Sequence, residues 1–362
     1  MITNQVLQNT IEGIVGITNI KMGVFDNQCR MLAGNLADDA AVVVEVANFI
    51  EDSAENKIVK NHQLVKINED GELEYILVVD GASESDILVA KMAAYQIKGL
   101  LVAYKEIFDK DNFIKNLLLD NLLLVDIYNR AKKLHIDADA KRVVYIVETK
   151  HEKDSNALEI VRTLFSSRPK DFITAVDEKN IIIVKEVKST ETFDDLLKLA
   201  KTVLDMLNTE AMSRVRISIG TVINEIKEVS KSYKEAKMAL DVGKIFYSEK
   251  NIIAYNNLGI GRLIYQLPMP LCKMFIKEIF DNKSPDDLDE EIVGTIAKFF
   301  ENSLNVSETS RQLFIHRNTL VYRLDKLQKQ TGLDIRVFED AITLKIAMMV
   351  VKYMKYMESL DY

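Results

Sequence analysis

The stretch that decides the C-terminal fold is residues 305–324, NVSETSRQLFIHRNTLVYRL. It predicts two short helices joined by a tight turn. The Ser307 hydroxyl is expected to cap the first helix, and Leu313 and Phe314 are expected to form its apolar end. Two short helices of this kind are typical of a helix-turn-helix, whose second helix enters a DNA groove.

The second helix is predicted to run over residues 317–331, with Gly332 in the left-handed conformation just past its end. Leu320, Leu324 and Leu327 recur at the spacing of one buried helix face. The polar side chains at and near the start of this helix lie mostly off that face. These candidate DNA-binding residues are His316, Arg317, Asn318, Thr319, Tyr322, Arg323 and Lys326.

Each candidate has an expected role. Residues 317–319 are expected nearest the bases, because a recognition helix reads DNA with its N-terminal residues. Arginine can bind guanine through two hydrogen bonds, and asparagine can bind adenine in the same way. Arg323 and Lys326 are expected to meet phosphates and Tyr322 to donate its hydroxyl, while His316 caps or lines the helix.

Charge supports this interpretation. The chain has 47 Lys+Arg against 55 Asp+Glu, a net charge of -8, yet residues 311–329 carry five basic side chains and one acid, Asp325. A basic patch on an acidic protein suits phosphate contact. The alternative from periodicity and charge alone is a solvated amphipathic helix in an ordinary bundle.

The same residues carry a family resemblance. From about Ile292 to Ala347, and above all in the Leu-Phe-Ile-His-Arg-Asn-Thr-Leu run, the chain resembles the C-terminal domain of the sugar diacid regulator and PucR family of bacterial transcription regulators. That family usually has Ala where this chain has Ser310, and we expect the packing to survive because Ser is nearly as small. The resemblance implies a double-stranded DNA operator and a small-molecule effector such as a sugar acid.

Composition bounds the rest of the chain. A length of 362 residues and 48% apolar content suggest two or three domains with sizeable cores. Cys29 and Cys272 are far apart, so we expect no disulfide, as in a reducing cytoplasm. We see no secretory signal and expect no apolar stretch long enough to span a membrane. The predicted class is a cytoplasmic α+β multidomain protein.

Residues 1–105 are predicted to form a PAS- or GAF-like α/β sensor, which more weakly resembles the family's diacid-recognition domain. Its strands flank the turn at 26–28 and the Asp70-Gly71 turn, and a helix follows over 85–103. A bound dicarboxylate would need cations, for which Arg30 and Lys21 are weak candidates. Arg30 reads more simply as a surface turn residue, and the whole domain could serve assembly alone.

Residues 106–135 are predicted to form one long helix, apolar around most of its circumference, within a linking and dimerisation segment over 106–140. The alternative is a helix buried within one domain. Since a helix-turn-helix gains from binding two half-sites, we expect a homodimer or higher homo-oligomer.

Residues 141–260 alternate strand and helix signals in the order β-α-β-β-α-β-α-β and resemble a GGDEF-like domain, notably in Ile-Ser-Ile-Gly at 217–220. The catalytic form of that fold needs a glycine-rich turn with acids that hold a metal ion. Here the hairpin turn at 176–180 reads Val-Asp-Glu-Lys-Asn, without glycine. We therefore expect a degenerate, non-catalytic domain.

A linker with a helix is predicted over 261–288, and the helix-turn-helix domain over 289–362, with a supporting helix at 289–300 and a last helix from Phe338 to Met357. The four histidines have no metal-ligand spacing, and we expect no catalytic residue, metal or cofactor. The chain is interpreted as a one-component, DNA-binding transcription regulator. The alternatives are a sensor or assembly protein that does not bind DNA, and a GGDEF-type nucleotide cyclase.

Overall fold

The computed structural model divides into two compact units, residues 1–114 and 115–362, and each is described by itself. The residues that the structure describes are 2–37, 40–69, 71–149, 155–210, 215–280 and 289–360.

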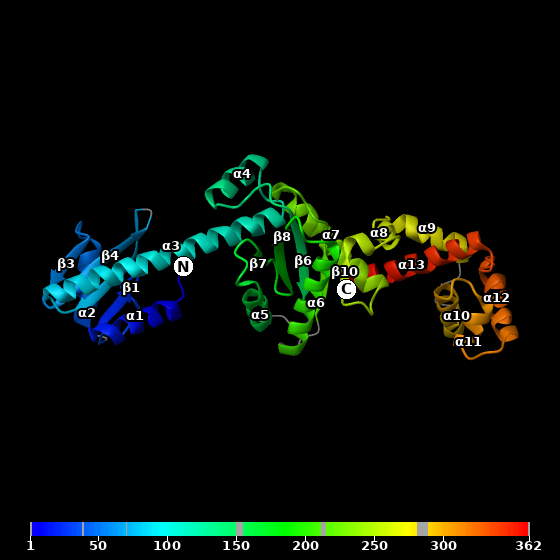
Figure 1. Cartoon of the computed structure of the whole chain (residues 1–362), viewed down its shortest axis with the longest axis horizontal. Coiled ribbons are helices and arrows are strands. Elements are labelled where there is room, and N and C mark those ends of the chain that lie inside the picture. Colours follow the sequence, from blue (N-terminus) through cyan, green and yellow to red (C-terminus); the bar gives the residue numbers. More distant parts are fainter. Residues whose placement is uncertain are drawn as a thin grey trace. The chain divides into compact units, whose positions relative to one another are not determined.

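Unit 1 is built on a five-stranded antiparallel sheet in the order β2-β1-β5-β4-β3. Its strands are β1 (Met22–Phe25), β2 (Met31–Gly34), β3 (Asn56–Val59), β4 (His62–Glu69) and β5 (Glu72–Asp80). Helices α1 (Asn4–Thr18) and α3 (Glu84–Leu118) pack on one face, and α2 (Ala40–Ile50) packs on the other. Figure 1 labels β1, β3 and β4 of this sheet together with helices α1, α2 and α3.

Strand β5 shows why both faces are covered. Leu77 and Val79 pack with α1 and α3, whereas Ile76 and Val78 pack with α2, because successive side chains of a strand point to opposite faces. Gly71, with φ 86°, sits in the β4–β5 turn as predicted. The predicted α/β fold is confirmed, although β3 was not predicted.

The helices predicted over 85–103 and 106–135 are wrong in extent. One continuous helix, α3, runs to Leu118, and a separate helix, α4 (Leu124–Lys133), follows it. Residues 84–118 contain no proline, and Gly99 is helical, so nothing ends the helix near residue 104. The break comes at Asp120, whose φ of 63° is left-handed, a conformation that Asp tolerates better than most residues.

Helix α3 contains an 18-residue window with mean hydropathy 1.3. By length and composition alone this helix could cross a membrane, so the expectation that no stretch reaches that length was wrong. Its inner face, with Ala90, Ala93 and Ile97, packs against the sheet of unit 1 as a core helix does.

Unit 2 contains the last residues of α3, helix α4 and a second five-stranded sheet in the order β10-β9-β6-β8-β7. Strands β9 and β10 are parallel, and the other pairs are antiparallel. Helices α5 (Ser155–Phe165) and α6 (Phe193–Glu210) pack on one face, and α7 (Val229–Phe246) contacts β6 and β9. The strands are β6 (Arg142–Glu148), β7 (Phe172–Ala175), β8 (Asn180–Glu186), β9 (Arg216–Ile219) and β10 (Ile252–Ala254), with 3₁₀ turns η1 (Ile226–Glu228) and η2 (Tyr255–Asn257).

Helix α7 lies unusually close to the end of β9. The Ser232 hydroxyl donates to the Thr221 carbonyl at 2.7 Å and accepts from the Val144 amide at 3.1 Å. A Cβ at Gly220 would lie 2.1 Å from the Ser232 carbonyl oxygen. Only glycine therefore fits at this position without moving the backbone of α7.

The remaining helices form an all-α part whose core is shared by α8 to α13. They are α8 (Gly261–Tyr265), α9 (Met269–Phe280), α10 (Glu290–Glu301), α11 (Val306–Gln312), α12 (Arg317–Thr331) and α13 (Phe338–Leu360). The predicted α9, α10, α12 and α13 are confirmed, and α8 was missed. The predicted linker at 282–287 lies outside the described residues.

Replacing Gly220 tests the close approach of α7. We expect Gly220→Ala to destabilise unit 2 by roughly 1–3 kcal/mol, because a rigid backbone carbonyl must move. Gly294→Ala is the matched control, since a Cβ at Gly294 of α10 meets nothing within 4 Å. It should be neutral or stabilising by about 0.4–1 kcal/mol. Thermal unfolding followed by circular dichroism measures both effects. Equal unfolding midpoints for the two variants would contradict the close approach of α7 to Gly220.

Candidate DNA-binding site

The first helix of the motif, α11, is capped one position before its start. The Asn305 side-chain oxygen accepts from the Glu308 amide at 3.0 Å. The prediction that Ser307 is the cap was wrong: Ser307 is already helical, and Asn caps a helix as well as Ser does. Ser310 is buried, and its hydroxyl donates to the Ser307 carbonyl at 2.9 Å. The small side chain thus fits between the helices as expected.

The turn contains a residue whose position was predicted incorrectly. Helix α11 ends at Gln312, and Phe314 lies in the turn with φ 54° and is 95% exposed. Leu313 and Ile315 on either side pack against the helical core. This exposed aromatic ring beside the start of α12 is a further candidate for contact with DNA. Periodicity gave no signal for it, because apolar residues at a helix end are usually buried.

Three leucines fix how α12 is rotated. Leu320, Leu324 and Leu327 are 0–1% exposed, as predicted. Gly332 has φ 75° at the C-terminal cap, also as predicted. At the other end, the His316 Nδ1 atom accepts from the Asn318 amide at 3.2 Å, so this ring caps the helix.

The first turn of α12 presents its side chains to solvent. Arg317, Asn318, Thr319 and Tyr322 are all exposed. Within the described part of the chain, the Arg317 guanidinium has no hydrogen-bond or ion-pair partner. These residues therefore form one polar surface at a helix N-terminus, where amide groups and the helix dipole favour an anion.

Arg323 and Lys326 are placed differently from the four residues of the first turn. Arg323 forms an ion pair with Glu291 and donates to the Thr295 hydroxyl at 3.1 Å, and only 14% of its side chain is exposed. Lys326 forms an ion pair with Asp289, and this hydrogen bond raises the pKa of Lys326. Both contacts hold α12 against the start of α10. Their phosphate-binding role stays a prediction, and it would require each side chain to leave its carboxylate.

The two weak candidates in unit 1 do not meet. Arg30 pairs with Asp26 of its own turn at 2.8 Å, and its side chain is 70% exposed. Lys21 is exposed just before β1. The structure shows no contact between them among the described residues, so the ligand role proposed for either one stays a prediction.

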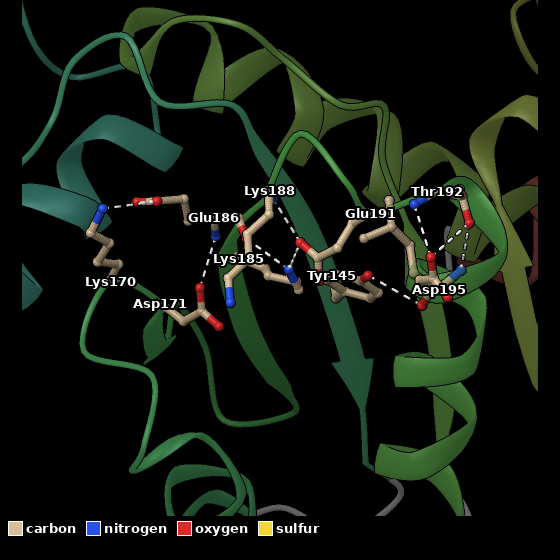
Figure 2. A network of polar contacts seen from close by, with 10 residues as sticks. Tyr145, Lys170, Asp171, Lys185, Glu186, Lys188, Glu191, Thr192 and Asp195 are labelled. Atoms are coloured by element: carbon tan, nitrogen blue, oxygen red, sulfur yellow. Dashed lines mark hydrogen bonds and ion pairs between the residues drawn. The ribbon is translucent and has the colours of Figure 1, made fainter.

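The sheet of unit 2 holds a polar network around Lys185 (Figure 2). The Lys185 ammonium is buried, pairs with Glu191 at 2.7 Å and donates to the Glu186 carbonyl at 2.7 Å. Asp171 accepts from the Glu186 amide at 2.8 Å, and burial raises the pKa of Asp171. The Tyr145 hydroxyl donates to the Leu196 carbonyl at 3.2 Å. These groups join β8 to the chain before α6, and each carboxylate is used within the fold.

The hairpin turn between β7 and β8 is self-contained. One oxygen of Asp177 accepts from the amides of Lys179 at 2.9 Å and Asn180 at 2.8 Å. The Asn180 side-chain amide donates to both Asp177 oxygens. This is an ordinary turn in which the aspartate satisfies its own backbone. Among the described residues, no group of three or more His, Cys, Asp or Glu could hold a metal ion.

Comparison with known proteins agrees with this geometry. Residues 121–242 match the GGDEF-like domain family, and residues 292–350 match the PucR C-terminal helix-turn-helix domain. The chain is 27% identical to the carbohydrate diacid regulator of Escherichia coli over 60% of this chain and 59% of that one. It is 26% identical to the DNA-binding transcriptional activator AdeR of Bacillus subtilis over 72% and 65%.

One solved structure, the regulator of polyketide synthase expression from Bifidobacterium adolescentis, aligns over 67% of this chain and 91% of that chain at 14% identity, with a TM-score of 0.35. The chain spans less than two thirds of the length of the curated relatives described above. The helix-turn-helix match covers the residues that carry the sequence resemblance, about 292–347. The GGDEF-like match overlaps the predicted range 141–260 but begins at residue 121, within the segment predicted as a linking helix. This protein thus carries a GGDEF-like domain followed by the C-terminal helix-turn-helix domain of the PucR family.

Proposed function

We propose that this protein is a cytoplasmic transcription regulator that binds a double-stranded DNA operator as a homodimer. The observation that carries the proposal is the exposed first turn of α12, where Arg317, Asn318 and Thr319 stand on a helix anchored by buried leucines. A rigid helix that presents hydrogen-bonding side chains at its N-terminus suits entry into the major groove. The named relatives, a diacid regulator and a DNA-binding activator, support this proposal.

In this proposal a small-molecule effector, such as a sugar acid, biases DNA binding through unit 1. An effector can act only if it binds one arrangement of the protein better than another. Arg30 is already paired with Asp26, so an acid bound by unit 1 would rely on other donors, such as lysines or main-chain amides.

The GGDEF-like domain is proposed to be a structural part of the regulator and not an enzyme. Asp177 is occupied by its own turn, and a nucleotide phosphate would find no glycine there to allow close approach of the backbone.

We expect the purified protein to make no cyclic dinucleotide from GTP and magnesium, because the acidic side chain at the hairpin cannot hold a metal while it caps the turn. Chromatographic separation of the reaction products tests this. A metal-dependent product above the buffer control, lost in an Asp177→Asn variant, would show that the domain is catalytic.

Two substitutions in α12 should weaken DNA binding in different ways. Arg317→Ala should cost roughly 1–3 kcal/mol at the preferred operator and relax discrimination at one base position. Lys326→Ala should weaken binding to all DNA sequences about equally. It should also reduce the slope of log binding constant against log salt concentration by about one. Fluorescence anisotropy on an operator selected from random DNA and on a scrambled duplex, at several salt concentrations, measures both effects.

Arg323→Ala provides the structural comparison for this experiment. Because Arg323 is mostly buried against α10, its loss should lower the thermal midpoint as well as DNA affinity. Arg317→Ala should leave the midpoint unchanged, since the Arg317 side chain is exposed. If a folded Arg317→Ala variant kept full operator preference, the proposed orientation of α12 in the groove would be wrong.

The dimer is proposed to form along the outer face of α3. This outer stripe consists of Leu88, Met92, Tyr95, Gly99 and Val102, which are all exposed. They alternate in steps of four and three residues, which is the spacing of a coiled-coil seam. Met92 is 65% and Tyr95 82% exposed, and a Cβ at Gly99 would meet nothing within 4 Å. The seam thus lies on the opposite side of α3 from Ala90, Ala93 and Ile97.

Charge favours a parallel pair of α3 helices. One flank of the seam carries a lysine every seven residues, and the other flank carries uncharged residues. The first flank is Lys91, Lys98 and Lys105, and the second is Val89, Gln96 and Ala103. A parallel pair places each lysine flank beside the uncharged flank of the partner, whereas an antiparallel pair would bring lysines together.

We expect the protein to be a dimer at micromolar concentration and a Met92→Glu, Tyr95→Glu variant to be a monomer, because the new charges would repel across the seam. Leu124→Glu, Val125→Glu is the matched control, since both residues are exposed on α4 outside the stripe. Leu118, in the segment first predicted as the interface, is fully buried and is not suitable for this test. Light scattering gives the masses, and a folded double variant that remained dimeric would contradict this interface.

A further inference from the structure

A cavity of about 560 Å³ lies within unit 2, beside the helical core that supports the helix-turn-helix. Its walls come from the end of α7 and the residues after it, from Ile260, from α10 and from α13. The cavity is within the size range of small-molecule sites. It is distinct from the DNA-binding surface, because no residue of α11 or α12 lines it.

The cavity wall is mostly apolar. Its principal side chains are Phe246, Ile260, Ile296, Phe300, Met348 and Met349. The aromatic rings supply flat apolar surface, and the adjacent methionines can adjust to the shape of a ligand. A wall of this composition suits a hydrocarbon chain or an aromatic ring. It has few hydrogen-bonding groups for a sugar or another strongly polar ligand.

The lining also contains three lysines: Lys250, Lys345 and Lys352. The Lys345 ammonium lies over the Phe300 ring at 5.4 Å, and the Lys250 ammonium lies over the Tyr247 ring at 5.0 Å. Among the described residues, none of the three lysines has a carboxylate partner.

The acids in the lining do not cancel these charges. They are Glu249 and Glu301, and Glu301 is already paired with Lys298 at 2.5 Å. The lining therefore has an excess of positive charge next to an apolar wall.

We infer that this cavity is a binding site for a small amphipathic anion, a medium-chain or aromatic monocarboxylate. The apolar body would displace water from the wall of the cavity, and the carboxylate would accept hydrogen bonds from Lys345 and Lys352. A neutral ligand of the same shape lacks the charge-assisted hydrogen bonds, and a short dicarboxylate lacks the apolar body. The site thus selects a chemical class different from a sugar diacid.

The position of the site suggests a regulatory role, and this part of the inference rests on the proposed function. Helix α10 contributes Val293, Ile296 and Phe300 to the cavity, and it also holds α12 through the Glu291–Arg323 pair. Phe246 and Ile260 belong to the segments that precede the helical core. A bound ligand would join these segments and so favour one placement of α10.

Isothermal titration calorimetry on the full chain tests binding without DNA. The probes are decanoate and 2-naphthoate, with 1-decanol as the uncharged control and succinate as the control without an apolar body. We expect saturable binding of at least one monocarboxylate at one site per chain, about tenfold weaker binding of 1-decanol, and no binding of succinate. Absence of saturable binding by both monocarboxylates would overturn the site.

Three variants locate the binding site. Lys345→Gln, Lys352→Gln should reduce monocarboxylate affinity about tenfold while leaving 1-decanol affinity unchanged. Lys273→Gln, which removes an exposed lysine of α9 outside the lining, should change neither. Ala297→Trp should obstruct the cavity and abolish both, and its fold is checked by circular dichroism.

Unchanged monocarboxylate affinity in the double lysine variant would overturn the site, whether or not Ala297→Trp folds. An equal loss in Lys273→Gln would also overturn it. Operator affinity is then measured with and without the bound acid. Ligand binding without any DNA binding would refute the proposed function and leave the site intact, so the two failures are distinguishable.

Discussion

The burial of one row of leucines determines what the C-terminal part of this protein can present to a partner. Leu320, Leu324 and Leu327 are essentially inaccessible to solvent, and exposing a buried leucine costs about 1.5–3 kcal/mol. A rotation of α12 by one residue would turn this row by about 100° and remove it from the core. The side chains of Arg317, Asn318 and Thr319 are therefore held outward by packing on the other side of the helix.

Local signals predicted much of the fold. The ends of α12, the left-handed Gly332 and most strands of both sheets follow from periodicity, branched residues and turn chemistry that act over a few positions. The continuity of α3 could not be predicted in this way. Its expected end near Ala103 corresponds to no break in the backbone, and the left-handed residue comes only at Asp120.

The sequence predicted which residues form the candidate site better than it predicted the contacts that these residues make. His316 as a cap and the exposed first turn of α12 follow from helix geometry. The carboxylates that hold Arg323 and Lys326 belong to Glu291 of α10 and to Asp289 just before it, 32 and 37 residues earlier in the chain, and no local pattern links them. The same holds for the cavity, whose walls come from four separate segments of unit 2. Such contacts exist only after the helices have packed.

The acidic start of α10 also affects how the protein would search a genome. Each phosphate contact by Arg323 or Lys326 must replace an ion pair that already exists, with Glu291 or Asp289. The binding free energy that these two side chains gain from random DNA would therefore be smaller than that of unpaired cations, and encounters with random sequence would be brief. A regulator with short residence on non-specific sites moves by repeated dissociation and rebinding more than by sliding. In the proposed function, occupancy of an operator would then depend on contacts of Arg317 and Asn318 with bases.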